Sequence, residues 1–178
     1  MHMPSTQVRQ GGKRLAPLLV GFALVLSLLV LCFAPLFHGL AIHDGRTGER
    51  LMLLPIWTGE AFSIRYTHSV NLTPVTDTLR FTGQGLVLES TLFTSYGWGM
   101  PVLADGIGSH FENTPEGFLI TGIDRAQPDV PILLQQVPDH HLLYRDREIS
   151  LLGLAGSGAF LRLGPEPASL AALLFARA

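Results

Sequence analysis

The clearest strand pattern in the chain is FSIRYTHSVNLTPVTDTLRF, residues 62–81. Successive side chains of a strand point to opposite faces, so every second residue shares a face. In both halves of the stretch one such set is mostly apolar: Phe62, Ile64, Tyr66 and His68 in the first half, and Val75, Asp77, Leu79 and Phe81 in the second. The stretch therefore predicts a β-hairpin that reverses around Asn71-Leu72 and buries one face.

The register of this hairpin follows from bringing its large apolar side chains together. The predicted pairs are His68 with Val75, Tyr66 with Asp77, Ile64 with Leu79, and Phe62 with Phe81. His68 and Asp77 are then polar residues on an otherwise apolar face, at diagonal positions roughly 7–8 Å apart. The candidate polar cluster or ligand site at this end of the hairpin comprises Tyr66, His68, Ser69 and Asp77.

A Ser-His-Asp catalytic arrangement is disfavoured in this cluster. Ser69 follows His68 directly and points to the opposite face of the strand, and the chain contains no G-x-S-x-G nucleophile elbow. We therefore predict no enzyme activity. Two interpretations stay open: a hydrogen-bonded network that stabilises the fold, and a site for a ligand.

Residues 38–163 predict an all-β, antiparallel β-sandwich or barrel-like domain, because short β-segments alternate with Gly and Pro turn signals. The expected strands are 40–43, 49–57, 61–68, 74–82, 86–93, 117–123, 131–137, 141–145, 148–152 and 159–163. Gly164, Pro165 and Pro167 then act as breakers, and 168–176 predicts a short helix in the tail 164–178. We expect this helix to pack on the domain, lie at a membrane interface or meet a partner.

An uncharged stretch, residues 15–37, precedes this domain. Its 23 residues would span about 30 Å as a helix, which is long enough to cross a bilayer. Arg9, Lys13 and Arg14 precede it, so residues 1–14 are predicted to be a cytoplasmic basic tail. We predict a single-pass signal-anchor of a bacterial inner membrane with the C-terminal domain in the periplasm. A cleaved signal peptide or lipoprotein signal fits less well, because bulky residues occupy the cleavage positions.

The remaining 141 residues suit one compact domain. They carry nine Arg and all fourteen acidic residues, a net charge of −5, which excludes a strongly basic nucleic-acid binder. The single cysteine, Cys32, lies in the uncharged stretch, so the outer domain is expected to have no disulfide. Its histidines lack an H-E-x-x-H motif, and adjacent His140 and His141 would point to opposite faces of a strand. We predict no metal and no cofactor, with a site built from distant His68, Asp77 and His110 left open.

A second distinctive segment is TSYGWGMP, residues 94–101. Glycines in such a loop allow positive φ or close backbone approach. The segment is either a structural loop in which Trp98 covers the core or an interaction loop anchored by Trp98. The candidate interaction residues are Ser95, Gly97, Trp98, Gly99 and Pro101. The chain contains neither a P-loop nor a strand followed by G-x-G-x-x-G, so a nucleotide site lacks support.

These two motifs together resemble the bacterial family called domain of unknown function 1850. The resembling residues are Tyr66-x-His68-Ser69-Val70, Pro74-Val75-x-Asp77 and Ser95-x-Gly97-x-Gly99-x-Pro101. The similarity covers roughly residues 38–153. The chain departs from the family pattern at Asn71, at Asp77 where Glu is usual, and at Trp98 where Ala is usual. The shorter acid changes the reach of any ligand contact.

The resemblance implies a membrane-anchored extracytoplasmic protein associated with permeases of the TAXI class of tripartite ATP-independent periplasmic (TRAP) transporters. We therefore expect a transporter accessory protein whose β-domain contacts the permease or its substrate-binding protein. The alternative is a periplasmic sensor that binds a small ligand or metal through Tyr66, His68 and Asp77.

Overall fold

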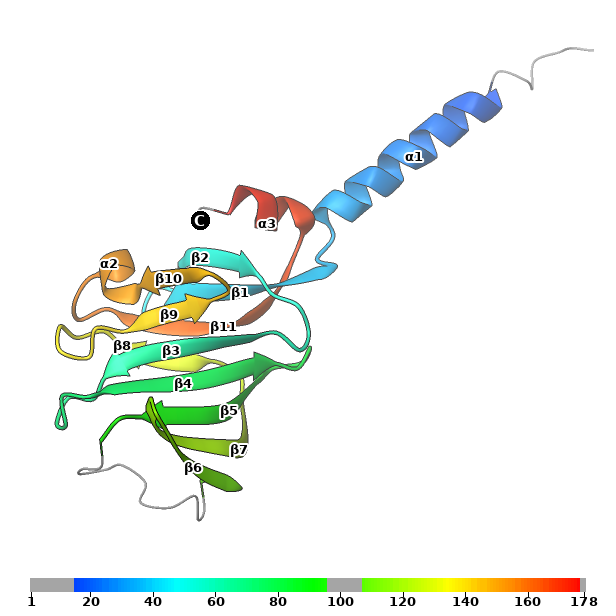
Figure 1. Ribbon diagram of the computed structural model, residues 1–178. Coiled ribbons are helices and arrows are strands. Elements are labelled where there is room, and N and C mark those ends of the chain that lie inside the picture. Colours follow the sequence, from blue (N-terminus) through cyan, green and yellow to red (C-terminus); the bar gives the residue numbers. More distant parts are fainter. Residues whose placement is uncertain (1–14, 96–106, 177–178) are drawn as a thin grey trace, which may run out of the picture.

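Two antiparallel β-sheets face each other in this computed structural model, which describes residues 15–95 and 107–176 (Figure 1). The smaller sheet has the order β2-β1-β11-β8 and contains β1 (Phe37–Asp44), β2 (Arg50–Pro55), β8 (Val130–Leu133) and β11 (Phe160–Ala168). The larger sheet has the order β10-β9-β3-β4-β5-β7-β6 and contains β3 (Ala61–Thr67), β4 (Pro74–Phe81), β5 (Leu86–Phe93), β6 (His110–Thr114), β7 (Gly117–Gln127), β9 (His141–Tyr144) and β10 (Arg147–Ser150). The predicted all-β class is confirmed.

The core lies between the inner faces of the two sheets. Leu40 and Ile42 of β1 meet the larger sheet's Phe62, Leu79 and Phe81 in one buried apolar cluster. Burial of each such side chain stabilises the fold by about 1.5–3 kcal/mol relative to leaving it in water. The alternation of apolar residues along 62–81 therefore determines which face of the hairpin turns inward.

The hairpin has the predicted faces but a different register. Phe62 pairs with Leu79, Ile64 with Asp77, and Tyr66 with Val75, which is a shift of two residues from the predicted pairs. An even shift keeps every side chain on its face. The prediction that Tyr66 lies directly opposite Asp77 is therefore wrong, and Tyr66 occupies a diagonal position instead.

The cause of the shift is a loop that begins at His68, one residue before the predicted start of the turn. The His68 N–H donates to the Thr73 carbonyl at 2.8 Å, and the His68 carbonyl accepts from the Leu72 N–H at 2.8 Å. The imidazole Nδ1 also accepts from the Asn71 N–H at 3.2 Å. Because this loop occupies His68, the strand ends at Thr67 and the last pair is Thr67 with Pro74, one residue earlier on each strand than predicted, which gives the two-residue shift in register.

The C-terminal strand continues through residues that we expected to end it. β11 extends to Ala168, past the predicted end at Leu163. Residues 160–163 pair with β8, whereas Pro165 and Pro167 pair only with β1 and so lie at a sheet edge. Proline is tolerated at an edge because the lost amide hydrogen breaks no second ladder.

In the part of the chain that the structure describes, three helices accompany the sheets (Figure 1): α1 (Leu15–Phe33), α2 (Leu151–Ala155) and α3 (Leu170–Phe175). Helix α3 confirms the predicted short C-terminal helix, and the Ser169 hydroxyl caps it by accepting from the Ala172 N–H at 3.1 Å. Helix α2 replaces the end of the expected strand 148–152, because Ser150 caps a helix that starts at Leu151. Among the described residues, no helix combines the length and the apolarity needed to cross a membrane.

Candidate functional site

A cavity of about 370 Å³ lies where the edge strand β8 meets the inner face of the larger sheet. Its polar lining consists of Tyr66, Asp77, Arg125, Gln127 and His140. Its apolar lining consists of Ile64, Leu79, Leu88, Val130, Pro131 and Ile132. The cavity thus brings several polar groups together on mostly apolar walls, which is the usual composition of a small-molecule site.

Asp77 is the charged residue in a mostly apolar row across the larger sheet. Its neighbours in that row are Ile64 of β3 and Thr91 of β5. Burial raises the pKa of the Asp77 carboxyl above its usual value. Hydrogen bonding from Thr91 and Tyr66 and the positive charge of Arg125 act in the opposite direction without cancelling the effect of burial.

Tyr66 connects Asp77 to the loop before β9. Burial, followed by the charge of Asp77 and a hydrogen bond with it, raises the pKa of Tyr66 to about 12. The hydroxyl is therefore protonated at neutral pH and donates to the carboxylate. On its other side the Tyr66 ring stacks on His140, with centroids 5.2 Å apart and ring planes 26° apart.

His140 contributes a neutral imidazole to the cavity. Burial lowers the pKa of this residue, with nearby Asp139 opposing the shift and nearby His141 adding to it. Its Nδ1 atom is buried and has no hydrogen-bond partner among the described residues. A buried ring nitrogen without a partner is a costly arrangement.

The backbone of β7 directs Arg125 to the cavity through a β-bulge. Pairing with β5 shifts between Leu88, which faces Arg125, and Ser90, which faces Thr121. Inside the bulge Gly122 has φ 66°, and a Cβ there would lie 1.9 Å from the Ser109 hydroxyl oxygen. Another residue here would be strained at this φ and would displace the Ser109 hydroxyl, so Gly122 favours the bulge that precedes Arg125.

The structure brings together only part of the predicted cluster. Tyr66 and Asp77 line the cavity, whereas His68 and Ser69 do not. His68 accepts from the backbone of its own loop, and Ser69 is exposed in that loop. The structure does not bring His68 to the cavity beside Asp77, because His68 has left the strand.

The sequence analysis did not place three functional candidates in the site: Thr91, Arg125 and His140. His140 carried a usable signal, since we predicted that it and His141 point to opposite faces. This is confirmed: His140 faces Tyr66, while the His141 Nδ1 lies 2.9 Å from a Glu148 carboxylate oxygen. No local pattern marked Arg125, because its place depends on pairing with β5.

The predicted interaction loop is described only in part. Ser95 follows β5 and is partly buried. Gly97, Trp98, Gly99 and Pro101 lie outside the described residues. Within the described part of the chain, no three His, Cys, Asp or Glu side chains are placed to hold a metal ion.

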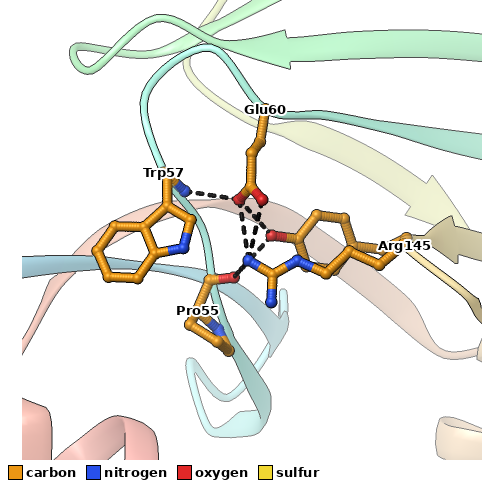
Figure 2. Close-up of polar contacts among 5 residues, drawn as sticks. Pro55, Trp57, Glu60 and Arg145 are labelled. Carbon is orange, nitrogen blue, oxygen red and sulfur yellow. Dashed lines mark hydrogen bonds and ion pairs between the residues drawn. The ribbon is translucent and has the colours of Figure 1, made fainter.

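A second polar cluster, around Glu60, has a different character (Figure 2). The Glu60 carboxylate accepts from the Trp57 N–H at 2.8 Å, from the Tyr144 hydroxyl at 2.6 Å and from Arg145 at 2.9 Å. Burial alone would raise the pKa of Glu60, but these three donors together lower it. Because the Glu60 carboxylate accepts from all three donors and the Tyr144 hydroxyl also lies 2.7 Å from the Pro55 carbonyl, the cluster ties β2, the start of β3 and the β9–β10 turn together.

Comparison with known proteins identifies a family for the region that holds the cavity. The family model described as Domain of unknown function (DUF1850) matches residues 62–151, just over half of the chain. No curated protein and no solved structure matches the chain. The matched region contains Tyr66, Asp77, Arg125 and His140, so the polar side of the cavity lies in the shared part. The chain belongs to the DUF1850 family.

Proposed function

We propose that the chain is a membrane-anchored extracytoplasmic protein that binds a small organic molecule with a basic group in the cavity between its sheets. The observation that carries the proposal is the environment of Asp77. Its carboxylate lies in the cavity, and none of the ion pairs among the described residues includes it. A partly buried carboxylate that forms no salt bridge is costly even with the longer-range charge of Arg125, so a ligand ammonium group would offset that cost.

The other lining residues define the rest of the ligand. The apolar walls of Ile64, Leu79 and Val130 suit a hydrocarbon body. Arg125 is exposed, so it lies on the solvent side, where it would face an acidic group at the outer end of the ligand. No Ser or Cys side chain is among the described lining residues, which supports binding rather than nucleophilic catalysis.

Calorimetric titration with two probes of similar shape tests this proposal. We expect benzylammonium to bind with a Kd of about 1 mM, as suits so small a ligand, and benzoate to bind at least tenfold more weakly. Asp77→Asn keeps the size of the side chain and should weaken benzylammonium binding at least tenfold. Asp124→Asn removes a similar charge from an exposed position and serves as the control. Equal binding of both probes, or unchanged affinity in Asp77→Asn, contradicts the proposal.

The membrane placement rests on the uncharged residues 15–37 and the basic residues before them. Helix α1 supports it, since the large apolar side chains described along it are mostly exposed rather than packed on the domain. Retention of the full chain in membranes after alkaline carbonate extraction is the expected result. Release of the full chain by that treatment would argue against the anchor.

Association with a TAXI-class TRAP transporter is a second proposed function, and its support is membership of the family together with the motif resemblance. The domain would contact the permease or its substrate-binding protein from the periplasmic side of the inner membrane. Co-purification of the full chain with a coexpressed TAXI permease in detergent tests the association. Its consistent absence from the purified permease counts against transporter association and leaves the cavity proposal untouched.

A further inference from the structure

Helix α3 divides its side chains between two environments. Ala172 and Leu173, together with Ala176 just after the helix, pack on Ala41 and Leu53, on the outer face of the smaller sheet. Leu174 and Phe175, by contrast, are 70% and 84% exposed. The helix thus covers one apolar patch of the domain and presents a new one outward.

This outward patch adjoins the point where α1 leaves the domain. Helix α3 contacts both α1 and β2, and Figure 1 shows it beside the C-terminal end of α1. The two meet because Ala168, just before α3, pairs with Phe37, just after α1. The apolar surface of α1 therefore continues onto the outward face of α3.

Two further apolar side chains extend the patch on the other side of this junction. Leu36 is exposed between α1 and β1. Trp57 is half exposed and lies edge-on to Phe37, with ring centroids 6.2 Å apart. Tryptophan combines an apolar body with a polar N–H, which is why it collects at membrane–water interfaces.

We infer that Leu36, Trp57, Leu174 and Phe175 form a membrane-contacting surface that holds the β-domain against the bilayer. The inference rests on the proposed anchor and goes beyond it, because an anchor alone would leave the domain free to tilt. Helix α3 has six residues, too few to span a bilayer, so it lies in the interface plane. A lipid surface is the occupant that the observations favour, because the patch continues an apolar helix that the proposal already places in lipid.

Fluorescence in liposomes tests this surface on the full chain. In a Cys32→Ser background, Leu174→Cys is labelled with the polarity-sensitive dye NBD. Val70→Cys is the matched control, since Val70 is 66% exposed in the β3–β4 loop, away from α1. Phosphatidylcholine brominated at carbons 6 and 7 of one acyl chain serves as the quencher. Trp57 is monitored separately in a Trp98→Phe background, because the chain has only two tryptophans.

We expect blue-shifted emission and quenching by brominated lipid at position 174, quenching of Trp57, and solvent-like emission at position 70. Solvent-like emission at position 174 in a chain that resists carbonate extraction overturns the inference and leaves the anchor standing. Extraction of the chain by carbonate overturns the anchor, and the inference falls with it. Equal quenching at positions 174 and 70 also overturns the inference, because lipid contact is then not confined to the α1 side.

Discussion

The ring of Tyr66 stacks on the imidazole of His140 across the end of the larger sheet, with centroids 5.2 Å apart. Tyr66 also bonds to Asp77, so one side chain joins Asp77 to His140. The two groups respond to burial in opposite directions, since burial raises the pKa of Asp77 and lowers that of His140. Both shifts favour the neutral form, which gives the cavity two testable pH dependences.

The first prediction concerns His140→Phe, which keeps a ring against Tyr66 and removes the titration. Because burial lowers the pKa of folded His140 below its usual value of 6.5, the unfolded chain binds this proton more tightly. The free energy of unfolding of the wild type should therefore fall as the pH drops below about 6.5. The free energy of unfolding of His140→Phe should fall by less over the same range. Urea unfolding at pH 7.5 and pH 5 measures the difference. Identical losses in the two proteins would show that His140 does not titrate with folding.

The second prediction concerns Asp77→Asn. The folded state binds the Asp77 proton more tightly than the unfolded chain does. The contribution of this proton to stability is therefore complete below a pH near 3.8, and it is lost as the pH rises through the pKa of Asp77 in the folded state. At pH 7.5 we therefore expect the Asn variant to unfold at equal or higher urea concentration than wild type. A purely stabilising network predicts a loss of about 1–3 kcal/mol instead. Paired urea unfolding curves distinguish the two outcomes.

Binding of a cation to the cavity should also depend on whether Asp77 is ionised. An ammonium group favours the ionised carboxylate, so the affinity for benzylammonium should rise as the pH rises through the pKa of Asp77. Calorimetric titrations at a series of pH values measure this, with Asp77→Asn as the flat reference. A wild-type affinity that stays constant with pH would place the amine elsewhere.

The third prediction separates His68 from the cavity. His68→Ala removes the acceptor for the Asn71 N–H, so we expect a loss of about 0.5–1.5 kcal/mol in the free energy of unfolding. Its affinity for benzylammonium should equal that of wild type, whereas Tyr66→Phe should bind more weakly. Calorimetry at a temperature where all three proteins are folded makes the comparison. Loss of benzylammonium binding in His68→Ala would show that His68 takes part in the site and would contradict this prediction.

The fourth prediction concerns the closed cluster around Glu60. Glu60→Gln should lower the free energy of unfolding by about 1–3 kcal/mol at pH 7, because the charged acceptor of three donors is lost. The lowered pKa means that the contribution of Glu60 is present above its usual value of 4.5 and is lost in acid, as the pH falls through its folded pKa. The difference between wild type and Glu60→Gln should therefore shrink toward pH 3 in urea unfolding. Glu49→Gln, at an exposed turn, is the control and should change little.

The sequence predicted the two faces of the 62–81 hairpin because strand alternation depends only on local spacing. It could not predict the register, because His68 uses its imidazole to close the loop, and that contact has no periodic signature. The path of β11 through Pro165 and Pro167 was missed for a similar reason. Whether those prolines break a strand depends on β8, which ends before reaching them.

The residues of the candidate site also fall into two groups, those that local spacing predicts and those that depend on the order of the strands. Tyr66 and Asp77 lie on one hairpin and were found from their spacing alone. Arg125 reaches the cavity through a bulge opposite β5, and His140 meets Tyr66 because β9 pairs with β3. Contacts of this kind come from the order of strands in the sheet, which no local pattern in one sequence specifies.

The most direct test of the cavity is an NMR titration of the ¹⁵N-labelled full chain in nanodiscs with benzylammonium. The ligand account predicts saturable shifts at the amides of Asp77, Thr91 and Arg125, with none at the Glu60 cluster. It also predicts that these shifts disappear in Asp77→Asn. Shifts confined to other parts of the molecule, or shifts that persist unchanged in Asp77→Asn, would contradict it.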